Sequence, residues 1–395
     1  MLAVVAVLLL AFNLRVAVSA VPPILADLRL DSFGQSLLVT VPVLCFGVAA
    51  LAGPRLRHRF GEEQLLLMVI AALVLGLLIR ALWPGAGLFP GTAVAALAVA
   101  IMNVVVPAVI RGRFPEQAAL MTSAYTVSLS IGAGLAAGLT VPILHIGGSL
   151  QLALGIWALP ALLGCLVWAT QVPLRHRRGI PASPPSAVPP AAGVSLWTSP
   201  VVRGVTAFFG LQSLVYYALL SWLPSIYRAR GDSAAAAGLL LGVMVTIGIV
   251  GNLVGPAVAS RTSDQRLAAL VAVSLAVVGL LGVLLAPLGT ALLWVGILGI
   301  GTGATFSVAL LLVVVRSANA ATAVRVSATA QGTGYLIAAT GPLVLGLVHA
   351  ATGGWTVPLL VLLALLLLET LPGLAAGRDR VVGLTQESSQ VSPRS

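Results

Sequence analysis

An arginine lies deep inside a long apolar run near the start of the chain. Arg15 sits within FNLRVAV at positions 12–18, and apolar residues continue on both sides. A guanidinium stays protonated in proteins, so it is costly in an apolar layer unless water, an anion or backbone carbonyls surround it. Arg15 therefore either binds an anion in a water-filled cavity or caps the carbonyls of a broken helix. We favour anion binding.

A second candidate group is a polar stripe in the apolar run at 201–227. Gln212, Ser213, Tyr216 and Tyr217 fall within an arc of about 140° at the helical step of 100° per residue. Such a stripe either lines a cavity or forms a hydrogen-bonded seam between helices. We favour a cavity lining, because hydroxyl and amide groups can orient a small polar ligand.

Other polar side chains lie in separate apolar runs, where helix packing is an equally good explanation for each one alone. Taken together, they are a stronger indication of a ligand site than any one of them alone. The set consists of Asn103, Tyr125, Thr305, Gln331 and Tyr335.

Three further polar positions look structural. Arg80 lies near the end of its run, where it can snorkel to the interface. His145 and His349 lie at the ends of runs and are predicted to be interfacial caps.

Glu369 is the single acidic residue inside a run, and it is off-centre. We therefore do not expect a carboxylate switch at the middle of the membrane.

The segments that carry these residues are long enough to cross a bilayer. Of the 395 residues, 59% are hydrophobic and 8% are charged, whereas about 25% are charged in a soluble protein. The prediction is an all-α integral membrane protein with twelve spans of roughly 20 residues or more. The spans are 1–26, 35–54, 64–83, 88–110, 118–144, 149–171, 201–227, 235–259, 266–287, 289–315, 324–350 and 355–373.

Composition and motifs exclude several kinds of chemistry. The chain has no lysine, so it has no Walker A loop, and the glycines at 299–303 lack the strand and helix of a nucleotide fingerprint. No cluster of His, Asp and Glu suggests a metal, a cofactor or an enzyme active site. Cys45 and Cys165 are predicted to be small core residues. The net charge of +11 fits basic loops at a membrane surface better than nucleic acid.

The arginines give an orientation. Sixteen of the 21 lie in one set of loops and the tail, three lie in the opposite set, and two lie within spans. The positive-inside rule then places both termini in the cytoplasm, in what we expect to be the inner membrane. The Pro- and Arg-rich stretch 172–200 is predicted to be a cytoplasmic linker, and 374–395 a disordered tail.

The two halves of the chain repeat each other at an offset of about 202 residues. Gly53-Pro54 recurs at Gly255-Pro256, and Arg59 recurs at Arg261. The same offset places Tyr217 opposite Arg15. The repeat predicts two pseudo-symmetric six-helix bundles, 1–171 and 201–373. Internal repeats of this kind are typical of secondary transporters, whose substrate site lies between the halves near the midplane.

Several short stretches resemble a known family. The chain looks like a member of the major facilitator superfamily, in its cyanate/2-nitroimidazole (CynX/NimT) branch. The stretches are NLR (13–15), PVLCFG (42–47), NVVVP (103–107), GLQS (210–213), SWLP (221–224) and QGTGY (331–335). The resemblance implies transport of cyanate-like anions or small heteroaromatic compounds. It also implies gating roles for Arg59 and Arg261, although His58, Glu62 and Glu63 depart from the superfamily's usual loop.

These observations predict a monomeric transporter of a small polar or anionic solute that works by alternating access. Arg15 would bind the anionic end, and the polar set above would orient the solute. The main alternative within transport is export of a small drug-like compound. A polytopic membrane enzyme or a transporter-like sensor fits less well, because the chain shows neither a catalytic cluster nor an output domain.

Overall fold

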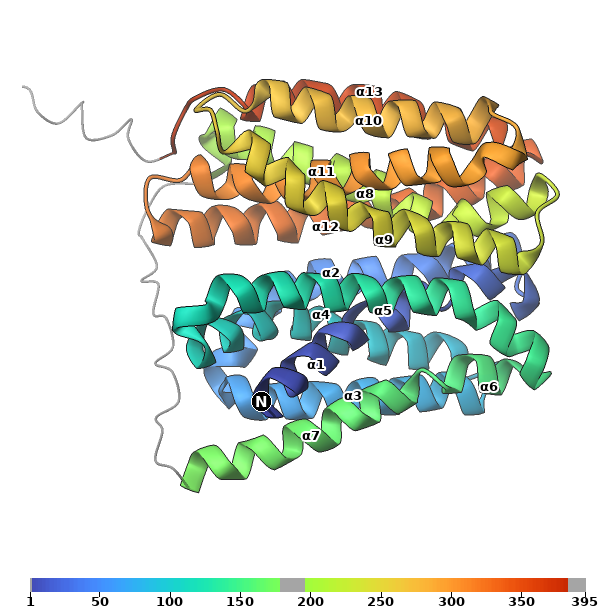
Figure 1. The fold of residues 1–395 in the computed structure, drawn as a ribbon, viewed down its shortest axis with the longest axis horizontal. Helices are drawn as coiled ribbons and strands as arrows, with labels where there is room; N and C mark the ends of the chain where they lie inside the picture. The colour runs from blue at the N-terminus through green and yellow to red at the C-terminus, as the bar shows by residue number, and fades with distance from the viewer. Residues whose placement is uncertain (1, 178–195, 383–395) are drawn as a thin grey trace, which may run out of the picture.

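The computed structural model describes residues 2–177 and 196–382, and nearly all of them are helical (Figure 1). The β-structure within these ranges is a single bridge between Ser317 and Val382. The long helices and the two short ones beside them are α1 (Leu2–Ser19), η1 (Pro22–Leu28), α2 (Ser32–Phe60), α3 (Glu62–Leu82), α4 (Leu88–Arg113), α5 (Ala118–Gly147), α6 (Leu150–Gly155), α7 (Ala158–Arg177), α8 (Pro200–Ala229), α9 (Ala234–Ala259), α10 (Arg266–Leu285), α11 (Ala291–Val315), α12 (Ala320–Thr352) and α13 (Thr356–Ala376).

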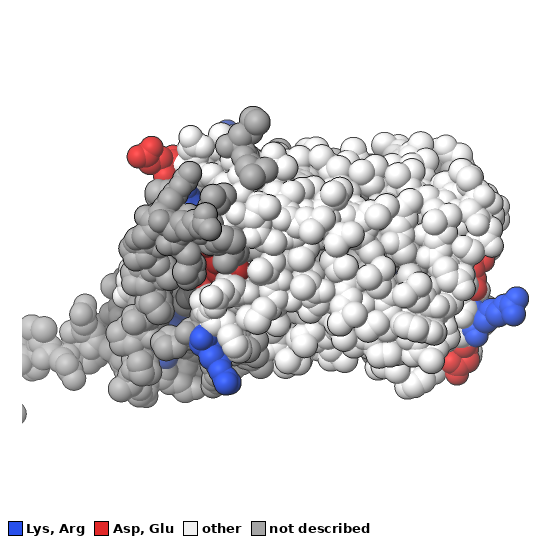
Figure 2. Space-filling view, turned by 90° about the horizontal axis from the view of Figure 1, so that it is seen from below, with Lys and Arg blue, Asp and Glu red and all other residues white. Residues whose placement is uncertain are grey.

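The helices have the length and polarity of membrane spans. In the described ranges eleven helices are long and apolar enough to cross a bilayer, and α1 with η1 makes twelve if this bent pair counts as one span. On the face shown in Figure 2, the surface between the charged residues at the two ends carries no Lys, Arg, Asp or Glu among the described residues. Helices suit this environment because every backbone group inside a bilayer needs a partner within the protein. The predicted all-α membrane fold is confirmed.

The helices form two groups that meet along a central plane. Helices α1 to α7 fill one half of Figure 1 and α8 to α13 fill the other, with α2 packed on α12 and α5 packed on α9 across the boundary. A β-carbon added at Gly242 would lie 2.9 Å from the carbonyl oxygen of Gly134. Small residues thus let the two bundles approach closely, as in other membrane helix pairs.

The first span is broken rather than continuous over 1–26. Helix α1 ends at Ser19, and the chain bends by 40° into η1. Pro22 and Pro23 begin η1, and neither has an N–H group to continue the hydrogen bonds of α1. Hydropathy cannot reveal this bend, because α1 and η1 together are apolar enough to count as one span.

Part of the predicted disordered tail is ordered. Helix α13 continues to Ala376, and the Gln265 N–H donates to the Gly377 carbonyl at 2.9 Å. The Val382 N–H donates to the Arg316 carbonyl at 2.8 Å. The prediction of disorder is therefore wrong for 374–382. The rest of the tail, 383–395, and most of the predicted linker, 178–195, lie outside the described residues.

Candidate functional site

Arg15 reaches from one bundle to the other. Its Nη1 donates to the hydroxyl oxygen of Tyr217 at 3.2 Å, which joins α1 to α8. Its Cζ lies 5.7 Å from the ring centroids of both Tyr216 and Tyr217, within the range of a cation–π contact. None of the ion pairs among the described residues includes Arg15. The guanidinium thus has aromatic and hydroxyl neighbours but no counter-charge.

Arg15 lines a cavity of about 320 Å³ between the bundles. Within the described residues, it is the one charged side chain in that lining. The other polar and aromatic side chains in the lining come from seven different helices. They are Phe46, Asn103, Thr122, Tyr125, Thr126, Ser130, Gln212, Ser213, Tyr216, Tyr217, Asn252, Thr302, Phe306, Gln331 and Tyr335.

Aromatic rings form one wall of this cavity. The ring centroids of Phe46 lie 5.8 Å from Tyr217 and 5.6 Å from Tyr335, and those of Tyr216 and Tyr217 lie 5.3 Å apart. Such separations are typical of favourable aromatic pairs. The arrangement offers flat apolar surfaces beside one fixed positive charge.

Nine of the ten predicted ligand-contacting residues line the cavity. Arg15, Asn103, Tyr125, Gln212, Ser213, Tyr216, Tyr217, Gln331 and Tyr335 are all in the lining. Some of these groups already hold one another. Tyr125 donates to the Asn103 Oδ1 at 3.4 Å, and Ser213 donates to the Gln212 Oε1 at 3.0 Å.

Thr305, the tenth residue, is not in the lining. Its hydroxyl is buried and donates to the carbonyl of Thr302 at 3.0 Å, within its own helix. Thr302 lines the cavity in its place. A threonine in a helix commonly bonds back to the preceding turn, so its presence in a span does not show which way the hydroxyl faces.

The sequence analysis missed Asn252, which lines the cavity from α9. Its Oδ1 is buried and has no hydrogen-bond partner in the part of the chain that the structure describes. An amide within the apolar stretch around 250–254 is the same signal that singled out Asn103, so the residue was open to prediction.

The cavity is closed at one end of the molecule. We call the end at which α1 begins and α13 ends the terminal end, and the other the opposite end. The cavity extends toward the terminal end as far as Thr122 and Leu310. Tyr217 lines both this cavity and a separate void of about 10 Å³ on its opposite-end side. Tyr217 therefore separates the two spaces.

The opposite end is held together by η1. This segment packs against α5, α8 and α9, and so bridges both bundles. The Arg228 Nη1 and the Asp27 Oδ2 form an ion pair at 3.4 Å between α8 and η1. In this structure the Arg15 site is therefore shielded from the opposite end.

Two arginines brace the terminal end, one in each bundle. In the first bundle, Arg113 Nη2 lies 2.8 Å from Glu63 Oε1, and the Arg113 Cζ lies 4.5 Å from the ring centroid of Trp168. In the second, Arg316 and Gln265 occupy the positions that the repeat pairs with Arg113 and Glu63, and the Arg316 Nη2 donates to the Gln265 Oε1. The repeat thus extends to side-chain contacts.

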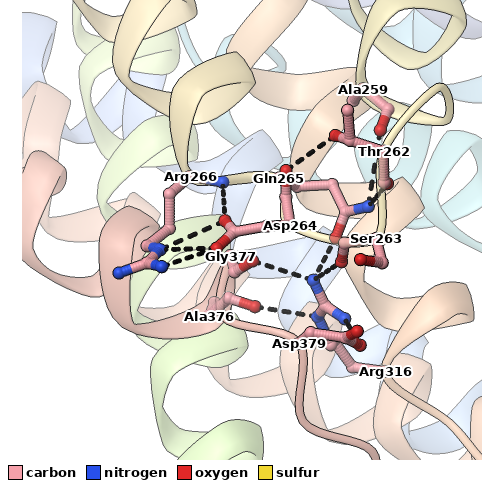
Figure 3. Close-up of polar contacts among 10 residues, drawn as sticks. All are labelled: Ala259, Thr262, Ser263, Asp264, Gln265, Arg266, Arg316, Ala376, Gly377 and Asp379. Atoms are coloured by element: carbon pink, nitrogen blue, oxygen red, sulfur yellow. Dashed lines mark hydrogen bonds and ion pairs between the residues drawn. The ribbon is translucent and has the colours of Figure 1, made fainter.

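Figure 3 shows the second brace. Arg316 is 2% exposed and donates to the carbonyls of Ala376, Ser263 and Gly377 at 3.1, 3.0 and 2.8 Å. It also lies 3.2 Å from Asp379. Beside it, hydrogen bonds from Arg266 lower the pKa of Asp264 to about 2. Arg316 thus ties the end of α11 to the α9–α10 loop and to the end of α13.

Arg59 and Arg261 lie apart from the cavity. Arg59 is exposed at the end of α2, with its Cζ 5.4 Å from the Phe60 ring centroid. Arg261 is exposed just after α9. Both are at the terminal end, and their predicted gating roles remain predictions.

Two residues have surroundings that the sequence did not predict. Arg80 is fully buried and donates to the Ala17 carbonyl at 2.8 Å, so the snorkelling interpretation is wrong. The physical reason is the broken first span, which exposes carbonyls that Arg80 can reach. Glu369 is also fully buried, and within residues 2–177 and 196–382 neither carboxyl oxygen has a hydrogen-bond partner. Glu369 is not in the cavity lining.

Comparisons with known proteins agree with this architecture. The family model described as Major Facilitator Superfamily matches residues 3–342. The chain is 35% identical over 382 residues to the 2-nitroimidazole transporter of Escherichia coli (strain K12), covering 95% of each protein. It is 30% identical over 353 residues to the cyanate transport protein CynX of the same organism, covering 88% of this chain and 90% of the relative. It is also 35% identical to the uncharacterized transporter YycB of Bacillus subtilis (strain 168), covering 95% of this chain and 93% of the relative.

Solved structures show the same fold at low identity. A bacterial homologue of the human lysosomal transporter Spinster, inward-facing and unoccupied, aligns with a TM-score of 0.75 at 13% identity, covering 95% of this chain and 96% of that one. A D-xylose–proton symporter aligns with a TM-score of 0.70 at 15% identity, covering 95% and 98%. The chain therefore belongs to the major facilitator superfamily, within the branch that contains CynX and the 2-nitroimidazole transporter.

Proposed function

We propose that this transporter carries a small planar anion, or a polar heteroaromatic compound with strong acceptor atoms, and that Arg15 binds its charged or acceptor end. The observation that carries the proposal is the uncompensated guanidinium in the cavity between the bundles. In the described structure its partners are tyrosines, which leave the positive charge unmatched.

Electrostatics favours an anion at this position. Charge interactions strengthen as the local dielectric constant falls, so a monoanion near Arg15 is stabilised more than it would be in water. A planar guanidinium also matches the planar fork of a carboxylate or nitro group. The rings of Phe46, Tyr217 and Tyr335 can pack on a flat solute. A volume of about 320 Å³ suits a small molecule.

The names of the relatives support this class. Cyanate is a small anion, and 2-nitroimidazole is a planar ring with a nitro group, so both present acceptor atoms to a cation. Both would also fit the cavity beside Arg15. We extend the class to aromatic monocarboxylates such as benzoate, because the aromatic wall leaves room for a ring.

Transport would proceed by alternating access. In the described state the opposite end is closed by η1, and the cavity extends toward the terminal end. A bound anion would replace Tyr217 as the partner of Arg15, which changes a contact between the bundles. A ligand shifts conformations only through such differential interactions.

A thermal-shift screen of the purified protein tests the proposed substrate class. Cyanate, benzoate and 2-nitroimidazole should each be compared with size-matched neutral or cationic compounds such as benzyl alcohol and benzylamine. We expect at least one of the first group to raise the melting temperature of the wild type but not of Arg15→Gln. Stabilisation by benzylamine alone, or equal stabilisation of both proteins, would contradict the assignment.

The arginine distribution further supports an orientation with the terminal end in the cytoplasm. Ser260 lies at the terminal end and Thr352 at the opposite end. Each is replaced by cysteine in turn, in a protein whose own cysteines are removed by Cys45→Ser and Cys165→Ser. We expect a membrane-impermeant thiol reagent, added outside intact cells, to label Thr352→Cys but not Ser260→Cys. The reverse pattern would overturn the orientation.

A further inference from the structure

Arg80 makes an isolated contact from α3 to the end of the first helix. The side chain is fully buried, its Nη1 donates to the Ala17 carbonyl at 2.8 Å, and its Nε and Nη2 have no hydrogen-bond partner among the described residues. None of the ion pairs among the described residues includes it. A permanently charged side chain costs free energy when it is buried in an apolar layer, so the single hydrogen bond of Arg80 needs an explanation.

The contact lies where α1 is broken. Pro22 and Pro23 have no N–H groups, so the carbonyls of Val18 and Ser19, four residues earlier, lack their usual helical donors. The end of a helix also carries partial negative charge, which a nearby cation stabilises. Inside an apolar layer these carbonyls cannot turn to water. Arg80 donates to the carbonyl of Ala17, the residue just before these two, and so caps the end of α1 from another helix.

Arg80 can hold this position because α3 and α4 are packed backbone to backbone. A β-carbon added at Gly91 would lie 2.6 Å from the backbone nitrogen of Arg80 and 2.7 Å from the carbonyl oxygen of Gly76. A β-carbon at Gly76 would lie 2.6 Å from the nitrogen of Ala95. The close packing of α3 on α4 therefore fixes the position from which the Arg80 side chain reaches α1.

We propose that Arg80 is a positioning residue for Arg15. Ala17 follows Arg15 by two residues, or about 3 Å along the helix axis. By fastening α1 at Ala17, Arg80 keeps the guanidinium of Arg15 directed at Tyr217 and the cavity. A frayed or rotated helix end would move that guanidinium away from its binding geometry. This inference rests on the proposed role of Arg15 as the anion-binding residue.

The second bundle provides a matched control. Arg230 donates from Nη1 to the Val283 carbonyl and from Nη2 to the Ala286 carbonyl, and so caps the end of α10. This is the same chemistry, also at the opposite end, but neither Arg230 nor α10 lines the cavity. Replacing Arg230 therefore reproduces the loss of a capping arginine without disturbing α1.

Hydrogen exchange of the ligand-free protein tests the cap. In Arg80→Met, amides at 14–20 should exchange at least about tenfold faster than in the wild type, because the end of α1 opens locally. Arg80→Lys keeps a donor and a charge and should restore most of the protection. Arg230→Met should leave these amides unchanged. Wild-type exchange at 14–20 in Arg80→Met would overturn the proposal.

Binding of benzoate, measured by titration, tests the link to Arg15. We expect Arg80→Met to raise the Kd at least about fivefold, Arg80→Lys to recover most of the affinity, and Arg230→Met to stay within about twofold of the wild type. An equal loss in Arg80→Met and Arg230→Met would show a general structural effect and overturn the positioning role. A wild type that binds no benzoate would contradict the extension of the substrate class to aromatic monocarboxylates, while the exchange experiment would still decide whether Arg80 caps α1.

Discussion

Arg15→Ala is expected to abolish saturable uptake in proteoliposomes while the protein remains folded and inserted. The alanine removes the one charged group in the described lining of the cavity, so an anion would lose its counter-charge and would have to be buried alone. Loss of one partner of a buried charge pair costs about 3–5 kcal/mol, which corresponds to an affinity loss of two orders of magnitude or more. The measurement is initial uptake of a radiolabelled anion that stabilises the wild type.

Two further variants make the result specific. Arg15→Lys keeps the charge but loses the planar fork, so its uptake should fall between those of the wild type and the alanine variant. Arg203→Ala removes an exposed arginine from the first turns of α8, outside the cavity lining, and should transport normally. Saturable uptake by Arg15→Ala at the wild-type rate, at equal protein density, would remove Arg15 from the binding site.

Gly303→Val is expected to prevent the second bundle from packing correctly. Gly303 lies on α11, and a β-carbon there would overlap the carbonyl oxygen of Gly248 on α9. The overlap is with backbone, which no side-chain rotation can relieve. Added bulk in a packed core typically costs about 1–3 kcal/mol, and contact with backbone belongs at the upper limit of that range. We expect a lower melting temperature in detergent and little monodisperse protein.

Gly296→Val is the matched control for this prediction. Gly296 lies on the same helix, seven residues earlier, and a β-carbon there meets no atom within 4 Å. The same substitution should therefore leave the melting temperature and the elution profile close to those of the wild type. A Gly303→Val protein as stable as Gly296→Val would show that α9 and α11 do not need their close approach.

The sequence predicted the cavity lining well where the signal was a polar residue in an apolar span. Arg15 and Tyr217 were paired through the 202-residue repeat, and their hydrogen bond joins residues that are 202 positions apart. A duplicated fold keeps equivalent positions opposite each other, so the offset carries three-dimensional information. The twelve spans followed from hydropathy, because a helix that crosses a bilayer needs about 20 apolar residues.

The rotation of a helix about its own axis and a break within a span could not be predicted in this way. Thr302 and Thr305 are both threonines in one apolar helix, and only the packing of α11 on α9 decides which of them faces the cavity. The function of Arg80 depends on carbonyls exposed by a bend that hydropathy does not register. Residues 377–382 include three charged residues, yet Arg316 and its backbone partners hold this stretch in place.

The ion pair between Asp27 and Arg228 has a consequence for the balance of populations. Its side chains are 38% and 31% exposed, and partly solvated pairs of this kind contribute only about 0–1 kcal/mol. Such a contact changes the ratio of two states by a factor of about five at most. A transporter that works by alternating access must visit both access states in every cycle. A strong ion pair at the opposite end would hold it in one of them. In the proposed alternating-access cycle, so weak a pair leaves the closed arrangement reversible by thermal energy, and the strength of the pair would vary with the salt concentration on that side of the membrane.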